Sequence, residues 1–363
     1  MSQKIGFIGL GLIGGSIAKA IRQYYPDDKI VAYNRSKEPL ALATREMVID
    51  VACARIDDNF KDCDYIFLCT PVARNNELLK QLVGYVHKDL IITDVGSVKS
   101  GIHNAVKESG LEPYFIGGHP MAGSERTGYS ASKATILENA FYVLTPTEEV
   151  PREKIDRYYR LVEGIHAIPI LLECGLHDHI TGTISHLPHL IASSLVNFVK
   201  DTDTKDELMK NLAAGGFKDI TRIASSSPDM WESICVENKE NISTILGQYI
   251  ESLIKTKAMV DAADGQGIYD MFEKSRNYRN AIPEVSAGPI KKAYAMCLDV
   301  EDEAGVIAII ATILAANAIN IKNIGIINNR EFEEGALRIE FYDADSLKKA
   351  IGLLEKRYII YER

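Results

Sequence analysis

The amino-acid sequence predicts an α/β protein with a mostly parallel, doubly wound sheet, followed by an all-helical domain and a small βαββαβ unit. Apolar strand-like runs alternate with helix-like spacing up to residue 173, which is typical of parallel sheets. The pattern is almost wholly helical from 174 to 283. After a linker at 284–290, strands and helices alternate again over 291–363. We therefore expect three domains: 1–173, 174–283 and 291–363.

The composition is that of an ordinary soluble globular protein, with 46% hydrophobic and 25% charged residues. The net charge of −9 argues against a surface that binds nucleic acid or anionic membranes. No apolar run approaches the roughly 20 residues that span a bilayer, and no secretory signal precedes the first strand. The six cysteines include no C-x-x-C pair. We therefore expect reduced thiols in a cytoplasmic protein.

A glycine-rich loop follows the first expected strand, Lys4–Ile8, and leads into a helix from about Ile13 to Tyr24. A G-x-G-x-x-G loop between a strand and a helix predicts a Rossmann-type dinucleotide site. The glycines let the backbone approach the pyrophosphate, and the helix N-terminus attracts the anion. This context disfavours a plain tight turn without a nucleotide. The candidate cofactor ligands in this loop are Gly9, Gly11, Leu12, Ile13 and Gly14.

The second strand, Lys29–Tyr33, ends in Asn34, Arg35 and Ser36. An NAD site usually has an acidic residue here for the ribose hydroxyls, whereas an arginine suits the 2′-phosphate of NADP. The sequence lacks the acid, but Asn34 can also hydrogen-bond a hydroxyl. Solvated basic side chains are the alternative. The sequence therefore leaves NAD and NADP open.

The ends of later strands carry polar residues. Strands are expected at 65–70, 90–94, 114–117, 141–145 and 168–172, and helices at 76–86, 98–108 and 152–164. Thr70 and Pro71 follow one strand, where a nicotinamide ribose would pass in such a fold. Asp94 and Ser97 follow the next strand. Ser97 is a candidate catalytic residue and Asp94 a candidate cofactor ligand, although Asp94 could simply form a turn and Ser97 could cap a helix.

Residues 117–128, GGHPMAGSERTG, contain a histidine at the expected end of a strand. His119 precedes Pro120, which favours an extended backbone. Ligands bind at the carboxyl ends of strands in parallel α/β sheets. The sequence therefore favours a ligand-facing His119, with the pair Glu125 and Arg126 nearby, over an inert surface turn.

The helical region contains a second group of candidates. Ser185 and His189 open the run 190–199, which is apolar all round and is therefore expected to be buried, in a subunit interface. Gly215 suggests close backbone approach. Arg222 is suited to bind a carboxylate, or alternatively forms an ion pair on its own helix.

Four histidines fall close together, but no H-E-x-x-H arrangement accompanies them, so no metal site is predicted. They are His177, His179, His186 and His189. No G-x-S-x-G elbow is present, which excludes a serine hydrolase of that type. The single tryptophan, Trp231, is a candidate pocket residue or plain core.

The C-terminal region has a different order of expected strands and helices. Strands are expected at 292–300, 319–327, 336–342 and 358–361, with helices at 305–316 and 345–356 and a polar turn at 328–335. This βαββαβ order is the ferredoxin-like arrangement. It carries no catalytic cluster, which favours a regulatory or assembly role.

Six of these motifs together resemble the prephenate dehydrogenase family, and the C-terminal region resembles an ACT domain. The motifs are GLGLIGGS at 9–16, TDVGSVK at 93–99, GGHPMAGSERTG at 117–128, SHLPH at 185–189, GGFKDITR at 215–222 and DMW at 229–231. The ACT resemblance rests on the element order and on residues 302–305, where Ala304 replaces the proline of many ACT domains.

The resemblance implies oxidative decarboxylation of prephenate to 4-hydroxyphenylpyruvate, with hydride transfer to NAD or NADP. It implies that His119 accepts a hydrogen bond or proton from the substrate hydroxyl and that Arg222 binds a carboxylate. Ser97, Ser185 and His189 would position the substrate, while Glu125 and Trp231 would border the pocket. It also implies a homodimer through the helical domain. A further hypothesis is that L-tyrosine inhibits, either at the ACT unit or in the active site.

Three alternatives remain. Arogenate dehydrogenase differs only in its substrate side chain, and the absence of a clear acid for the arogenate ammonium favours prephenate. A 3-hydroxyacid dehydrogenase would need a lysine on the first helix of the second domain, where histidines stand instead. A non-catalytic nucleotide sensor with an ACT effector module would leave His119 without a role.

Overall fold

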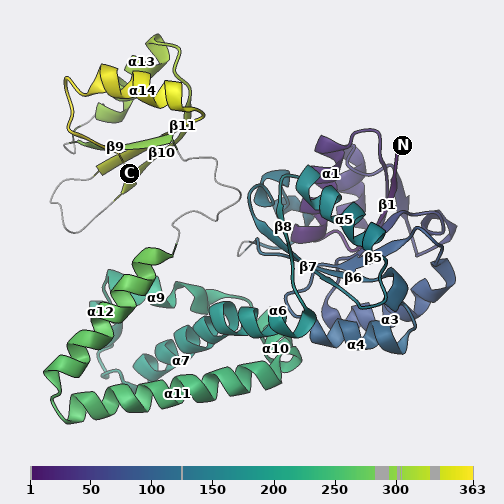
Figure 1. Ribbon diagram of the computed structural model, residues 1–363, viewed down its shortest axis with the longest axis horizontal. Helices are drawn as coiled ribbons and strands as arrows, with labels where there is room; N and C mark the ends of the chain where they lie inside the picture. Colours follow the sequence, from purple (N-terminus) through teal and green to yellow (C-terminus); the bar gives the residue numbers. More distant parts are fainter. Residues whose placement is uncertain are drawn as a thin grey trace. The chain divides into compact units, whose positions relative to one another are not determined.

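The computed structural model describes residues 2–123, 126–282, 294–300, 303, 305–327 and 336–362. The chain forms two compact units, Met1–Gly288 and Pro289–Arg363 (Figure 1). The predicted linker at 284–290, the turn at 328–335, and positions 302 and 304 of the ACT motif lie outside the described residues.

The first unit begins with a five-stranded parallel sheet in the order β3-β2-β1-β4-β5. Its strands are β1 (Lys4–Ile8), β2 (Lys29–Tyr33), β3 (Val51–Cys53), β4 (Tyr65–Leu68) and β5 (Ile91–Asp94). The order confirms the predicted Rossmann-type parallel sheet. The short strand β3 and the helix before it were not predicted, because three residues carry too little periodicity to be recognised.

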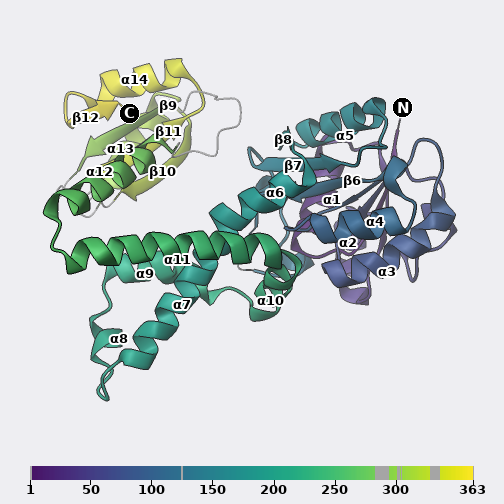
Figure 2. The same ribbon diagram turned by 60° about the horizontal axis from the view of Figure 1, so that its bottom comes forward.

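Helices cover both faces of this sheet, with α1 and α5 on one face and α3 and α4 on the other (Figures 1 and 2). The helices are α1 (Leu12–Tyr24), α2 (Lys37–Arg45), α3 (Val72–Leu82), α4 (Ser100–Glu108) and α5 (Arg152–Gly164). Successive strand side chains enter opposite cores. Phe7 packs in the cluster with α1 and α5, whereas Ile8 packs in the cluster with α3 and α4. Burial on both faces explains the continuous apolar strands.

The strands β6 (Ile116–Pro120), β7 (Phe141–Pro146) and β8 (Ile168–Leu171) form a separate three-stranded sheet. β6 pairs antiparallel with β7, and β7 pairs parallel with β8. The prediction of one mostly parallel sheet was therefore wrong for β6 and β7. Among the described residues between them, the only helices are short 3₁₀ turns, and a parallel return needs a longer crossover such as α5 between β7 and β8.

The rest of the first unit is helical. It comprises α6 (Cys174–Thr181), a π-helix (Gly182–His186), α7 (Leu187–Thr202), α8 (Leu208–Leu212), α9 (Gly215–Thr221), a 3₁₀ helix (Arg222–Ser225), α10 (Pro228–Glu237), α11 (Lys239–Asp261) and α12 (Gly265–Ala281). Within one copy, α7 buries only Ala192, its other apolar side chains are mostly half-buried, and Phe198 is 65% exposed. One copy of the chain therefore covers this apolar helix only in part, and its burial in a subunit interface stays a prediction.

The second unit contains a four-stranded antiparallel sheet in the order β10-β11-β9-β12, with two helices. Its elements are β9 (Tyr294–Asp299), α13 (Val306–Ala316), β10 (Ile321–Ile327), β11 (Ala336–Phe341), α14 (Ala344–Leu354) and β12 (Ile360–Glu362). Both helices contribute to one core, with Leu314 and Leu354 fully buried against strand residues such as Met296. Across both units, no helix in the described ranges is long and apolar enough to cross a bilayer.

Candidate active site

The glycine-rich loop lies at the carboxyl end of β1 and has the geometry of a nucleotide-binding turn. Gly9 has a φ of +102°, and a Cβ there would lie 2.6 Å from the carbonyl oxygen of Cys69. A Cβ on Gly14 would lie 2.5 Å from the carbonyl oxygen of Gly9. Both positions therefore require glycine, the first for the turn and the second for close contact between helix and strand.

Gly11 differs from these two glycines. It is the N-cap of α1, and a Cβ built on it meets no atom within 4 Å. The first turn of α1 has neither an acidic residue nor a side-chain cap. Its N–H groups are therefore available to an anion, and the residues fit a dinucleotide pyrophosphate.

Asn34 connects the glycine loop to the end of β2. Its Oδ1 accepts a hydrogen bond from the Leu10 backbone N–H at 3.0 Å, and its Nδ2 donates to the Ser36 carbonyl at 2.9 Å. The side chain thus orders the loop. Arg35 and Ser36 are exposed, where a ribose or its phosphate would pass in this fold.

A buried amide lies beside the end of β4. The Thr70 hydroxyl donates to Asn75 Oδ1 at 2.6 Å, and Pro71 is the N-cap of α3. Asn75 is fully buried, and its Nδ2 has no hydrogen-bond partner among the described residues. Because buried donors are normally paired, this amide is suited to a ligand acceptor near the strand ends.

Asp94 is fully buried at the end of β5 and makes internal contacts. One carboxylate oxygen accepts from the Lys99 ammonium at 2.5 Å and from the Gly96 N–H at 2.8 Å. The other accepts from the Gly118 N–H at 3.2 Å. Asp94 therefore forms the turn that presents Ser97, which is half-buried, and fixes it against β6.

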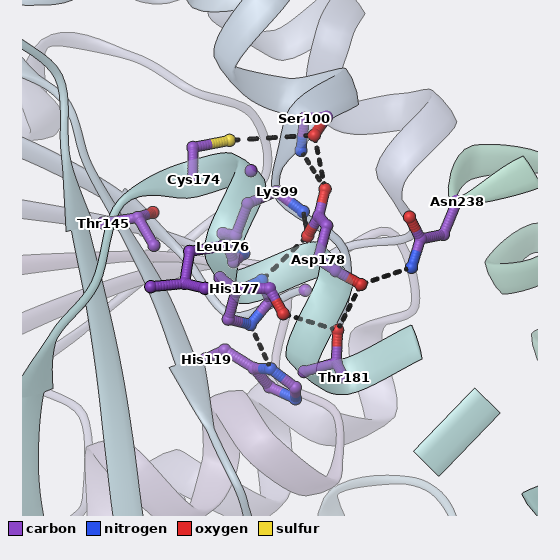
Figure 3. A network of polar contacts seen from close by, with 12 residues as sticks. Lys99, Ser100, His119, Thr145, Cys174, Leu176, His177, Asp178, Thr181 and Asn238 are labelled. Atoms are coloured by element: carbon purple, nitrogen blue, oxygen red, sulfur yellow. Dashed lines mark hydrogen bonds and ion pairs between the residues drawn. The ribbon is translucent and has the colours of Figure 1, made fainter. Parts of the chain in front are cut away.

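His119 projects from β6 and is half-buried. Its Nδ1 lies 2.8 Å from Nε2 of His177 on α6, and the two rings meet edge to face (Figure 3). Nδ1 of His177 in turn lies 2.8 Å from Asp178 Oδ1. Neither His177 nor Asp178 is exposed. The sequence analysis named His177 only as one of four neighbouring histidines for which no metal site was predicted.

Asp178 ties α6 to the start of α4. Its oxygens accept hydrogen bonds from the backbone N–H groups of Lys99 and Ser100, at 2.8 and 2.7 Å, and from the Ser100 hydroxyl at 2.5 Å. Burial acts to raise the pKa of Asp178, but the hydrogen bonds from His177 and Ser100 hold it below its usual range. Asp178 is therefore an ionised cap of α4.

His119 is neutral near physiological pH. Burial lowers its pKa well below 6.5, and the nearby Lys99, His177 and His186 lower it further. A neutral imidazole keeps one ring nitrogen as a hydrogen-bond acceptor. The arrangement therefore provides a weak base at the carboxyl edge of the sheet.

The helical part of the site is centred on the π-helix and α7. His189 Nδ1 donates to the Ser185 carbonyl at 2.9 Å, which leaves Nε2 as an acceptor. The His189 ring stacks on Trp231 with a centroid distance of 3.9 Å. Nε1 of Trp231 is buried and has no partner in the described ranges. This unpaired donor also suits a polar ligand.

Asn238 joins this group to α6. Its Nδ2 donates to the Asp178 carbonyl at 2.9 Å and to Nδ1 of His186 at 3.1 Å, and the His186 ring meets Trp231 edge to face. A continuous set of contacts thus runs from His119 to Trp231. Trp231 is therefore linked to the site and is more than isolated core.

The remaining predicted residues are Gly215, Arg222 and Glu125. Gly215 begins α9, and Arg222 begins the 3₁₀ helix 222–225, which packs against α7, the helix of His189. Glu125 lies outside the described residues, so its predicted place at the pocket entrance has no structural account.

Sequence reasoning missed Asn75, Asp178 and Asn238, and it missed the hydrogen-bonding role of His177. A usable signal existed for one pair. A His-Asp dipeptide in the first turns of a helix that is otherwise mostly apolar is unusual, because charged groups are buried only when paired. Asn75 and Asn238 offered no signal, since their burial depends on distant contacts.

Comparisons with known proteins agree with the geometry. The family description "Prephenate dehydrogenase, nucleotide-binding domain" matches residues 17–171, and "Prephenate dehydrogenase, dimerization domain" matches residues 173–274. The chain is 38% identical over 359 residues to a prephenate dehydrogenase of Bacillus subtilis, covering 98% of this chain and 97% of that protein.

Two solved structures are also similar. One is the prephenate dehydrogenase of Aquifex aeolicus in complex with hydroxyphenyl propionate and NAD+, at 30% identity and a TM-score of 0.73, covering 78% of this chain and 99% of that one. The other is an arogenate dehydrogenase of Synechocystis, at 27% identity and a TM-score of 0.70, covering 76% and 99%. The chain belongs to the prephenate dehydrogenase family.

Proposed function

We propose that this chain oxidises prephenate to 4-hydroxyphenylpyruvate and carbon dioxide, using NAD or NADP as the hydride acceptor. The observation that carries the proposal is a neutral His119 near the end of β6, a strand that lies beside β5 of the sheet with the glycine loop. Family membership supports the same reaction.

The chemistry matches a weak base at this place. Hydride leaves the ring carbon that bears the hydroxyl, and a bound nicotinamide would receive it. As carbonyl character develops, Nε2 of His119 accepts the hydroxyl proton in a hydrogen bond. The bond between the ring and its carboxylate then breaks and carbon dioxide is released. The electron pair of that bond completes the aromatic ring. The proton ends on the phenol oxygen, so the base is unchanged after turnover.

The other predicted residues take positioning and binding roles. Arg222 would hold a substrate carboxylate, because a guanidinium binds carboxylates in a bidentate manner. Ser97, Ser185 and His189 would align the substrate ring with the nicotinamide. Glu125, Gly215 and Trp231 would border the pocket. The cofactor would lie along the glycine loop and past the two strand ends, against Gly9, Gly11, Leu12, Ile13, Gly14, Asn34, Arg35, Ser36, Thr70 and Pro71.

Two predicted cofactor residues take a modified role in this proposal. The described side-chain contacts of Asp94 and Asn34 are all internal. We therefore assign them to shaping the loops that bind the cofactor. The basic and polar residues Arg35 and Ser36 stay the candidates for choosing between NAD and NADP.

Steady-state assays of prephenate and arogenate, each with NAD and with NADP, test this function. We expect turnover of prephenate and release of one carbon dioxide per hydride transferred. Activity with arogenate alone would favour the second candidate, to which the likeness to an arogenate dehydrogenase structure also points. The absence of turnover with every combination of substrate and cofactor would favour the non-catalytic nucleotide sensor.

The functional unit in this proposal is a cytoplasmic homodimer joined through the helical domain. The matched dimerization family supports it, as do the large apolar side chains that one copy leaves exposed on α7, α11 and α12. Examples are Phe198, Ile254 and Phe272. Burying such side chains is the usual driving force of a stable interface.

For the second unit we propose a ferredoxin-like ACT domain that responds to L-tyrosine. Its strand order β12-β9-β11-β10 with two helices supports this fold. Removing residues 283–363 distinguishes the two places where tyrosine could act. Inhibition lost on truncation would support the ACT unit, and inhibition that persists would assign tyrosine to the active site.

A further inference from the structure

His177 and Asp178 complete the surroundings of His119 in a way that the reaction above does not use. The hydrogen bonds to His119 and Asp178 occupy both ring nitrogens of His177. The three side chains therefore form one chain of hydrogen bonds that ends at Nε2 of His119 (Figure 3).

The direction of these hydrogen bonds follows from Asp178. An ionised carboxylate only accepts, and its other partners are the donors of Lys99 and Ser100. Nδ1 of His177 must therefore carry the hydrogen. In neutral His177, Nε2 then carries a lone pair and accepts a hydrogen bond from Nδ1–H of His119. Nε2 of His119 is consequently a lone pair as well.

We propose that His177 and Asp178 are positioning residues that fix the His119 tautomer in which Nε2 is free to accept the substrate hydroxyl. A lone imidazole favours the opposite tautomer, with the hydrogen on Nε2, which could only donate there. The tautomer is a property of the free protein. Its kinetic consequence rests on the proposed function.

The surrounding positive groups favour a neutral His119 ring. The groups that face it are Asp178 on α6, Lys99 before α4 and His186 in the π-helix. The Lys99 ammonium is fully buried and bonded to Asp94 at 2.5 Å. A second positive charge next to it is disfavoured. Protonation of His177 would reverse its bond to His119 and place the hydrogen on the wrong nitrogen.

The first test is the ¹⁵N NMR spectrum of the full-length protein labelled in histidine, because protonated and unprotonated ring nitrogens have well-separated shifts. The His119 signals are identified by their loss in His119→Gln. We expect Nδ1 protonated and Nε2 unprotonated in the wild type, and the reverse in His177→Leu. Wild-type Nε2 carrying the hydrogen would overturn the proposal.

The second test uses kinetics with a conservative rescue. His177→Leu should lower kcat by about 10–100-fold, below the roughly 10⁴-fold loss caused by a wrong tautomer in a serine protease. Its KM values should change less than about threefold, because binding groups stay in place. His177→Gln supplies an acceptor oxygen and should restore most of kcat. Equal losses in the two variants would indicate a packing role instead.

A double-mutant cycle separates tautomer control from stability. Asp178→Asn removes the charge that holds the hydrogen on His177 Nδ1, and it should lower kcat by about 10-fold in the wild-type background. In the His177→Gln background it should have less than about a threefold effect, since an amide oxygen accepts without that charge. Equal effects in both backgrounds would contradict the proposal.

The matched control is Thr181→Val. Thr181 donates to the His177 carbonyl at 3.0 Å from the same helix but does not touch the ring chain. It should change neither the His119 shifts nor kcat. If the wild type does not turn over prephenate but shows the expected shifts, the proposed function fails and the positioning role stands. If the wild type turns over prephenate but Nε2 of His119 carries the hydrogen, the proposed function stands and the positioning role fails.

Discussion

At the scale of single residues, His119 shows how environment gives a common side chain a specific chemical state. Its ring is neutral because it is buried beside Lys99 and His177. The strand places it, but a helix more than fifty residues later completes its surroundings. The motif around His119 could be read from the sequence, whereas this partner could not, because nothing local links β6 to α6.

Replacing His119 by asparagine should lower kcat by roughly 10²–10⁴-fold, the usual contribution of a general base. The dissociation constant of the cofactor, measured by fluorescence titration, should change less than about twofold, because the glycine loop is untouched. His179→Asn is the matched control, since His179 is exposed on the same helix as His177. An unchanged kcat in His119→Asn would remove the residue from the mechanism.

A second prediction concerns stability against pH. Burial lowers the pKa of His186 to about 4, and the pKa of His119 is also depressed. The unfolded chain therefore binds protons more tightly than the folded chain below about pH 6.5. The free energy of unfolding should have its full value above about pH 6.5 and should decrease as the pH drops from about 6.5 towards 4.

Urea unfolding at pH 7, 6 and 5 checks this. The decrease in the free energy of unfolding between pH 7 and pH 5 should be smaller in His186→Gln, because glutamine binds no proton at that position. A steeper loss of stability in this variant than in the wild type would contradict the assignment. Most carboxylates titrate below this range and so affect the slope little.

At the scale of elements, the glycine loop could be predicted almost completely. Strand, loop and helix are contiguous, so their signal is local, and α1 was placed within one residue. The sheet was harder. The direction of β6 depends on the absence of a crossover helix after it, and the loop 121–140 gave no clear sign of that. Local patterns therefore identified the elements better than their pairing.

Gly11→Ala tests the open space at the N-terminus of α1. The new Cβ meets no protein atom, and φ at this residue is −91°, so the melting temperature should change by less than about 2 °C. A methyl group there should obstruct the pyrophosphate and raise KM for the cofactor by about 10-fold or more, with KM for prephenate nearly unchanged. Gly84→Ala, also in open space but away from the loop, is the control. Unchanged cofactor KM would contradict the assignment.

At the scale of the whole molecule, the helical domain is incomplete as a single copy. The run 190–199, predicted to be buried in a subunit interface, is only partly covered within one copy, because the sequence reports the apolarity of α7 but not which chain covers it. Hydropathy therefore identifies a surface that needs a cover, and the proposed cover is a second copy of the chain.

Ile254→Lys on α11 should weaken self-association, since Ile254 is 61% exposed in one copy and a buried lysine would be costly at an interface. Sedimentation velocity should show a shift from dimer to monomer at micromolar concentration. Val83→Lys, on an exposed apolar position of the sheet domain, should leave the dimer intact. A dimer unaffected by Ile254→Lys would place the interface elsewhere.

The π-helix Gly182–His186 has a consequence for how related chains diverge. One residue fewer in this segment would convert it to regular α-helix and rotate everything that follows by about 100°. His189 on α7 would then change its direction relative to His177 on α6, although no side chain in the pocket had been substituted. The length of this segment is thus itself a heritable determinant of which groups face the substrate. It can change by a single-codon deletion, and comparisons of residue identity alone would miss it.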